Sequence, residues 1–178
     1  EYDYSWATPE SHGNDINKHG QIVGDSKAPG GVNHAFLWDP ETEEMKDLGT
    51  LGGDNSRAVH INDAGQIIGT STTTSGESHA FLWTGTMHDL GSFGKDSYAS
   101  DLNEEGHVVG HSRTGDRDCA GSLVSHAFIY TGSQMQDMGT LGGLSSSATD
   151  INKHDQVVGW AETPDGSRHA FLWENGGM

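Results

Sequence analysis

The chain has 178 residues, the size of one ordinary domain, and its 9 basic and 26 acidic side chains give a formal net charge of −17 at pH 7. This negative field repels phosphate backbones and anionic lipid headgroups, which argues against nucleic acid as a partner. The sequence has no run of about 18 apolar residues that would span a membrane, and Glu1–Trp6 lacks the basic and apolar regions of a signal peptide.

The first recurring element in chain order is an Ile/Leu-Asn pair, followed by a turn and by a short apolar run that ends in glycine. Asparagine, aspartate and glycine in the turn accept positive φ, which is typical of a hairpin between two short strands. Successive motif asparagines are 45, 41 and 49 residues apart, at Asn17, Asn62, Asn103 and Asn152.

The second element is His-Ala-Phe-Leu-Trp at 34–38, 79–83 and 169–173, with the variant His-Ala-Phe-Ile-Tyr at 126–130. The third, Met-x-Asp-Leu/Met-Gly-Thr/Ser-Leu/Phe-Gly, begins at Met45, Met87 and Met135. Together with the first element they form a repeat of about 45 residues. In the second repeat we expect strands at Ala58–Ile61, Gln66–Thr70, His79–Trp83 and Met87–Ser92, which is the pattern of a propeller blade.

The repeats predict an all-β fold, a four-bladed β-propeller in one domain. The expected units are approximately 12–53, 54–94, 95–143, and 144–178 together with 1–11. If Met178 is imagined joined to Glu1, the distance to Asn17 is 17 residues, matching the 17, 16 and 17 residues found inside the chain. We therefore expect Tyr2–Trp6 to complete the last blade and close the ring. A fragment of a longer propeller, or two chains sharing one ring, stays open.

The three motifs in this fixed order resemble the HAF repeat family, which occurs as arrays in bacterial extracellular proteins. The resemblance covers nearly the whole chain. It implies a β-propeller-like repeat architecture and an extracellular or cell-surface location, but no general activity. Ser92-Phe-Gly-Lys95 and Ser5-Trp-Ala-Thr8 depart from the glycine motif, so a role that needs this motif four times is in doubt.

The repeated histidines and phenylalanines are expected to be structural, because every blade needs the same packing. The histidines begin equivalent middle strands on different blades, which predicts hydrogen bonding and not convergence on one metal ion. The phenylalanines are expected in the core. His107 and His111 lie on one strand, where four residues span roughly 13 Å, so they cannot chelate one ion together.

A candidate cation site is formed by the position two residues before each motif asparagine. If this strand is the innermost one, pseudo-fourfold symmetry places three carboxylates and one imidazole around the channel. Hard divalent ions such as Ca²⁺ prefer carboxylate oxygens. The alternative is that these side chains bond to neighbouring turns. The four residues are Asp15, His60, Asp101 and Asp150.

The least repeated segment is 113–125, an insertion that lengthens one loop. Loops on a rigid scaffold often carry binding residues, so Asp116, Arg117 and Asp118 are candidate ligand contacts, although simple length variation also explains the insertion. Cys119 is the single cysteine of the chain, which rules out an intrachain disulfide.

These patterns favour a non-enzymatic extracellular binding or scaffold module, with a cation in the channel and a carbohydrate or protein ligand on one face. The alternative is a polysaccharide hydrolase or lyase that uses loop carboxylates as acid and base. No nucleophile elbow, zinc-finger spacing, EF-hand loop or phosphate-binding loop occurs in the sequence. The chain is expected to be a monomer, or a dimer if two chains share one ring.

Overall fold

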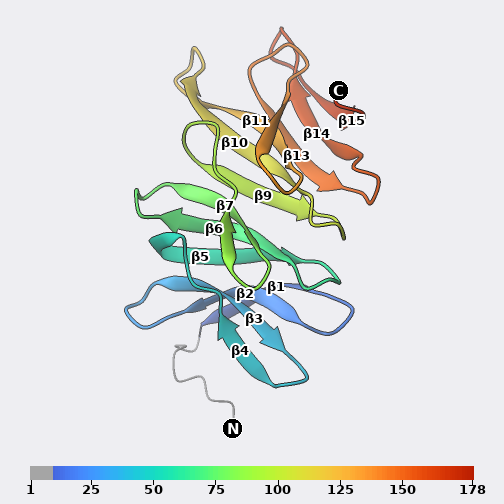
Figure 1. Cartoon of the computed structure of the whole chain (residues 1–178). Helices are drawn as coiled ribbons and strands as arrows, with labels where there is room; N and C mark the ends of the chain where they lie inside the picture. Colours follow the sequence, from blue (N-terminus) through green and yellow to red (C-terminus); the bar gives the residue numbers. More distant parts are fainter. Residues whose placement is uncertain (1–9) are drawn as a thin grey trace. The chain divides into compact units, whose positions relative to one another are not determined.

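The computed structural model describes residues 10–178, and every regular element within that range is a β-strand. The strands form four antiparallel sheets, in each of which consecutive strands pair in chain order. Sheet A consists of β1 (Ser11–Ile16), β2 (Ile22–Lys27), β3 (Asn33–Asp39) and β4 (Glu44–Asp47), and sheet B of β5 (Gly52–Ile61), β6 (Ile67–Thr73), β7 (Ser78–Trp83) and β8 (Met87–Asp89). Sheet C consists of β9 (Ser97–Leu102), β10 (Val108–Arg117), β11 (Leu123–Tyr130) and β12 (Met135–Gly139). Sheet D consists of β13 (Ser146–Ile151), β14 (Val157–Glu162) and β15 (Arg168–Trp173) (Figure 1).

The all-β expectation is confirmed: sheets A, B and C each contain one copy of the repeat, and sheet D contains its first two motifs. The four strands expected in the second repeat are present with different bounds. β5 is longer at its start, where Gly52 pairs with Thr73, and β6 is Ile67–Thr73. The last strand was expected to reach Ser92, but β8 ends at Asp89. The strand Tyr2–Trp6, expected to complete the last blade, lies outside the described residues. Between residues 10 and 178, none of the elements is a helix that could cross a membrane.

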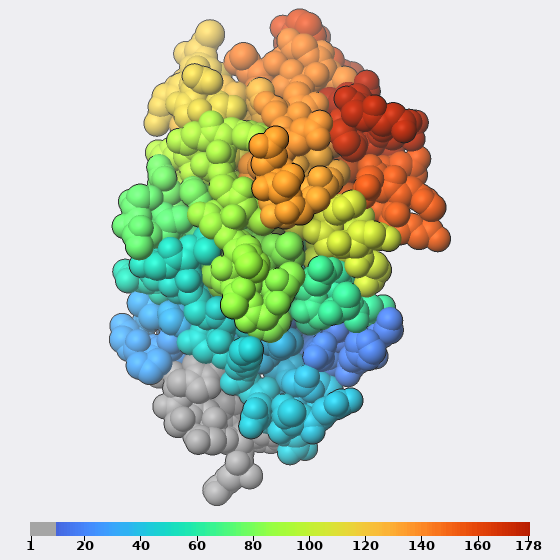
Figure 2. Space-filling view, viewed as in Figure 1, coloured from blue at the N-terminus to red at the C-terminus, as the bar shows by residue number. Residues whose placement is uncertain are grey.

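The chain divides into two compact units, and each is described by itself. Unit 1 ends at Asp89 and contains sheets A and B; unit 2 begins at Leu90 and contains sheets C and D. In the space-filling view, the blue and cyan atoms of sheet A lie directly against the teal and green atoms of sheet B within unit 1 (Figure 2).

Within each unit, two sheets stack face to face, and we call their contact a seam. The leading face of a sheet is the side that carries residues such as Val23 and Leu37, which are register partners on β2 and β3. The trailing face of the next sheet carries residues such as Ile61 and Phe81. These side chains form the buried core of unit 1, so the seam is where apolar burial stabilises the stacked sheets.

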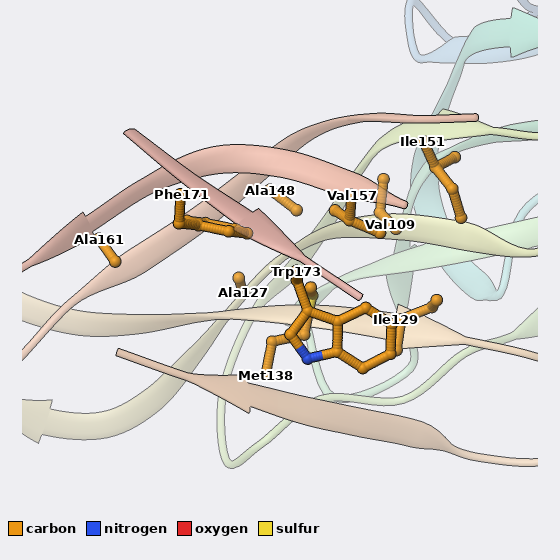
Figure 3. Packing of buried hydrophobic residues seen from close by; sticks show 10 residues of the cluster. All are labelled: Val109, Ala127, Ile129, Met138, Ala148, Ile151, Val157, Ala161, Phe171 and Trp173. Carbon is orange, nitrogen blue, oxygen red and sulfur yellow. The ribbon is translucent and has the colours of Figure 1, made fainter. Parts of the chain in front are cut away.

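The core of unit 2 repeats this arrangement (Figure 3). Val109 and Ile129 on the leading face of sheet C meet Ile151 and Phe171 on the trailing face of sheet D. The indole of Trp173 lies close to Met138 and Ile129 in the same cluster. The expectation that the repeated phenylalanines pack in the core is confirmed: the exposed fractions of Phe36, Phe81, Phe128 and Phe171 are 3%, 0%, 0% and 6%.

One glycine of each repeat is required by close packing of two strands. A Cβ on Gly69 would lie 2.0 Å from the carbonyl oxygen of Arg57, and one on Gly110 would lie 2.0 Å from the carbonyl oxygen of Tyr98. A phenylalanine ring also approaches each of these positions. No side chain fits there unless the first two strands of the sheet separate.

Candidate functional site

The repeated histidines hold the third strand of a sheet to the fourth. The Nδ1 atom of His34 lies 2.7 Å from a carboxylate oxygen of Asp47, and His126 Nδ1 lies 2.7 Å from Asp137. His79 makes the same contact with Asp89 at 2.9 Å. The structural role expected for these histidines is therefore confirmed in sheets A, B and C.

The motif asparagines shape the hairpin turn and also bridge to the next sheet. The Oδ1 atom of Asn17 accepts hydrogen bonds from the backbone N–H groups of His19 and Gln21, both at 3.1 Å. Its Nδ2 donates to the carbonyl oxygen of Asn62 at 3.2 Å, across the seam. Asn103 donates to the carbonyl oxygen of Asn152 in the same way at 3.3 Å in unit 2.

The positions expected to hold a cation form a second bond across the seam. Asp15 Oδ2 accepts a hydrogen bond from the backbone N–H of Ile61 at 2.9 Å, and Asp101 Oδ2 accepts one from Ile151 at 2.9 Å. We call this carboxylate-to-backbone bond the latch. His60 Nδ1 lies 2.5 Å from Asp15, so unit 1 brings these two predicted ligands together.

The latch agrees with the alternative in which these side chains bond to neighbouring backbone. Asp150 is exposed on sheet D, in the same unit as Asp101. Among residues 10–178, no cluster of three or more His, Cys, Asp and Glu side chains is arranged to hold a metal ion. A calcium ion at these four positions stays a prediction.

The segment that carries the loop candidates extends a hairpin. Asp116 and Arg117 lie near the end of β10, where Arg117 pairs with Leu123 of β11, and Asp118 follows in the turn. Asp118 Oδ1 accepts the backbone N–H groups of Ala120 and Ser122 at 2.9 and 2.8 Å. Asp118 therefore shapes the hairpin turn. Asp116 and Arg117 are exposed and stay candidates for a ligand contact.

His107 and His111 have different partners. His107 Nδ1 lies 2.7 Å from Asp155 Oδ1, an oxygen that also accepts Asn103 Nδ2 at 2.9 Å. His111 stacks on Tyr98, with ring centroids 5.1 Å apart.

Sequence reasoning missed a set of residues that differ between the repeats but occupy equivalent places. On the second strand of each sheet, the residue is the one that follows the packed glycine. On the first strand, it is the register partner of that residue. The signal was available as a variable position inside an otherwise regular motif. The register pairs are His12 with Asp25, Arg57 with Thr70, Tyr98 with His111, and Ser147 with Trp160.

At the seam of unit 1 these positions form a charged and polar site. Asp25 is only 8% exposed, and its Oδ1 lies 3.2 Å from Arg57 Nε. Asn14 joins the pair: its Nδ2 donates to the carbonyl oxygen of Ala58 at 2.7 Å, and its Oδ1 accepts Arg57 Nη2 at 3.0 Å. The carboxylate of sheet A is thereby fastened to the first strand of sheet B.

A cavity of about 300 Å³ opens beside this ion pair, and every residue that lines it is polar or charged. Its walls come from β2 and β3 of sheet A and from β5, β6 and β7 of sheet B. The cavity contains hydroxyl, amide, carboxylate and guanidinium groups, which together offer both hydrogen-bond donors and acceptors. The lining residues are Asp25, Asn33, Asn55, Ser56, Arg57, Thr70, Ser71, Thr72 and Ser78.

At the seam of unit 2 the equivalent positions carry aromatic rings. The guanidinium of Arg113 lies over the Tyr98 ring at 5.6 Å, and its Nη1 bonds Asp96 Oδ2 at 2.6 Å. Burial lowers the pKa of His111 below its ordinary value, and the positive charge of Arg113 lowers this pKa further. On sheet D, Arg168 lies over the Trp160 ring at 4.0 Å.

Comparison with known proteins gives a family match over part of the chain and one structural match. Residues 94–177 match the family described as Protein of unknown function (DUF3466). None of the curated proteins matches this chain. The solved structure of TolB from Acinetobacter baumannii superposes on 94% of this chain with a TM-score of 0.53 and 16% identity, and the match spans 44% of the TolB chain. This likeness supports a β-propeller-like fold for four sheets built from one repeat.

Proposed function

We propose that this protein is a non-enzymatic binding scaffold, a β-propeller in which each of the four sheets is one blade. The repeated polar residues support this proposal, because they are engaged in holding strands and sheets together. The residues that differ between repeats lie instead on the second strands and at their register partners, and in unit 1 they line a polar cavity. The resemblance to HAF repeats supports an extracellular or cell-surface location.

The observation that carries the proposal is the polar cavity at the seam of unit 1. Asp25 and Arg57 neutralise each other across 3.2 Å, so the cavity does not select strongly for either charge. Planar carboxylate, guanidinium and amide groups can bond pairs of hydroxyl groups through several donors and acceptors. A small carbohydrate is the ligand class that fits this chemistry.

The enzymatic alternative has less support. Glycoside cleavage uses two carboxyl groups that flank the bond, one of which must act as an acid. Asp25 is ion-paired with Arg57, and the other residues that line the cavity carry no carboxyl group. Asp118 in the lengthened hairpin is hydrogen-bonded to its own turn. These contacts suit binding better than proton transfer.

Ligand-observed NMR against a panel of soluble oligosaccharides, followed by calorimetry on the best ligand, tests the proposal. Arg57→Ala is expected to weaken that ligand at least about tenfold, because it removes several donors from the cavity. Arg168→Ala is the matched control, since it removes the same charge from sheet D without touching the cavity. Binding that survives Arg57→Ala and is lost when Asp116 and Arg117 are replaced by Ala would place the ligand at the hairpin instead. Release of cleaved sugar would support the enzymatic alternative.

A further inference from the structure

The polar cavity of unit 1 contains two pairs of residues that join sheet A to sheet B. One is the ion pair of Asp25 and Arg57. In the other, the backbone N–H of Asn33 donates to the side-chain Oδ1 of Asn55 at 3.0 Å. Asn33 lies two residues from the register partner of Asp25, and Asn55 precedes Arg57 by two residues on β5. The cavity therefore presents a charged pair and a neutral amide pair side by side along the seam.

Three hydroxyl groups of the cavity are already engaged by the protein backbone. Ser56 Oγ accepts a backbone N–H of β3 at 2.8 Å, and Ser71 Oγ accepts the N–H of the residue before β5 at 2.8 Å. Thr72 Oγ1 accepts the N–H of Asn55 at 2.9 Å and donates to its carbonyl oxygen at 3.1 Å. These hydroxyls hold the walls of the cavity together and keep little capacity for a ligand.

The side-chain amides of Asn33 and Asn55 do keep that capacity, and both residues are exposed at the cavity. Because Asn55 Oδ1 accepts the N–H of Asn33, the other end of this amide is its Nδ2, which has two N–H groups to donate. Within residues 10–178, neither Asn55 Nδ2 nor the side chain of Asn33 forms a hydrogen bond. Sheet B therefore offers a donor, and sheet A offers an amide with both a donor and an acceptor.

A secondary amide on the ligand matches these groups. Like a peptide bond it is planar and trans, so its N–H and C=O point in opposite directions and need partners on opposite sides. Asn33 Oδ1 can accept the N–H, and Asn55 Nδ2 can donate to the C=O. Among carbohydrates, the acetamido group of an N-acetylated amino sugar is a group of this kind.

Other substituents at the same ring position fit less well. A uronic acid brings a carboxylate to a chain with a formal charge of −17, and the guanidinium of Arg57 is already paired with Asp25. An amino sugar without its acetyl group carries an ammonium, which has no acceptor for Asn55 Nδ2. A hydroxyl offers one oxygen atom in place of a separate donor atom and acceptor atom.

We propose that Asn33 and Asn55 are specificity-determining residues that select an N-acetylated amino sugar for the cavity of unit 1. This inference rests on the carbohydrate-binding function proposed above and adds the group by which the ligand is recognised. A site built to bond a polar group discriminates against an analogue that lacks the group, because the protein atoms then lose their partner.

Calorimetry with four soluble trisaccharides tests the proposal. The trimers are those of N-acetylglucosamine, glucosamine, glucose and galacturonic acid, so three of them share one sugar skeleton and differ in a single substituent. The N-acetylglucosamine trimer is expected to bind at least about tenfold more tightly than each of the others, because it alone satisfies both asparagines.

Asn55→Asp separates the two ends of the amide. The variant keeps an oxygen that accepts the N–H of Asn33 and replaces the donor with a second oxygen. It is expected to weaken the N-acetylglucosamine trimer at least about tenfold and the glucose trimer less. Asn33→Ala, which keeps its backbone N–H, is expected to reduce the same preference. Asn175→Asp is the matched control, since it makes the same change at an exposed residue outside the cavity.

Two further measurements accompany the variants. Melting curves that match the unmodified chain establish that each variant folds. In NMR spectra, the side-chain NH₂ signal of Asn55, assigned by its loss in Asn55→Asp, is expected to shift with the N-acetylglucosamine trimer and to shift less with the glucose trimer.

The outcomes distinguish this inference from the proposed function. Equal affinity for the N-acetylglucosamine and glucose trimers, or a preference that survives Asn55→Asp, would overturn selection by the asparagines. If that binding is still weakened by Arg57→Ala, the carbohydrate-binding function stands without it. A chain that binds none of the four trimers would contradict both proposals.

Discussion

The seams of unit 1 and unit 2 share their backbone contacts and differ in their side chains. Both are joined by a latch of 2.9 Å and by an asparagine that donates to the next turn. Beside these bonds, unit 1 places the Asp25–Arg57 ion pair and a polar cavity, whereas unit 2 places the stacked Tyr98 and His111 rings. One scaffold therefore presents two chemically different surfaces.

The largest effect is expected at the packed glycines and should be equal in both units. Gly69→Ala and Gly110→Ala each place a Cβ 2.0 Å from a carbonyl oxygen of the neighbouring strand, so each is expected to lower the free energy of unfolding by at least about 3 kcal/mol. Thermal and urea unfolding measure the loss. Gly177→Ala is the control, because a Cβ there meets nothing within 4 Å. A clear difference between the two units would contradict a shared scaffold.

The latch is expected to have an intermediate effect and also tests the calcium prediction. Asp101→Ala leaves the N–H of Ile151 without this acceptor, which is expected to cost about 1–3 kcal/mol. Melting curves should show this loss in excess chelator, where no ion can contribute.

A comparison in calcium then separates the latch from an ion. If calcium is bound at the predicted positions, Asp101→Asn and Asp150→Asn lower stability in calcium and not in chelator, because a bound ion stabilises only the folded chain. Equal stability changes in the two buffers would contradict the calcium prediction and leave the latch as the role of Asp101.

The smallest effect is a pH dependence confined to the seam of unit 2. The folded pKa of His111 is lowered by burial and by Arg113, so the unfolded chain takes up this proton first. This contribution to stability is complete above the ordinary histidine pKa of about 6.5 and is lost as pH falls below it. His111→Phe keeps an aromatic ring and removes the titration.

Urea unfolding of both proteins between pH 7.5 and 5.5 measures this difference. The unmodified chain is expected to lose more stability than His111→Phe on acidification. Parallel curves would indicate that His111 titrates normally. Arg168→Ala, which removes an exposed cation from sheet D, should leave the difference between the two pH values unchanged.

The repeat itself was predictable because each motif has a direct structural cause. The apolar run 80–83 after His79 indicates a strand with both faces packed, and Ala80, Phe81 and Leu82 are buried. His79 bonds Asp89 from the third motif. A recurrence of about 45 residues could therefore be converted into four sheets. The pairing of sheets into seams follows from the apolar residues on both faces.

The role of Asp15 could not be derived from alternation. A β-bulge shifts the register between Gly13 and Asp15, and an equivalent shift lies between Ala148 and Asp150 on sheet D. A bulge changes which side of the strand the next side chain takes, so simple period-two counting fails there. The Asp25–Arg57 site was missed for another reason: its residues vary between repeats, and a search for repetition passes over them.

The placement of the variable pairs separates the residues that fold this protein from those that can be exchanged. The second-strand positions 25, 70, 111 and 160 each follow a packed glycine, and none of them is part of a latch or of a turn. Randomising these positions together with their register partners would vary the surface while the packed glycines, the latches and the turns stay unchanged. In engineering terms the chain is a display scaffold with four separately addressable sites.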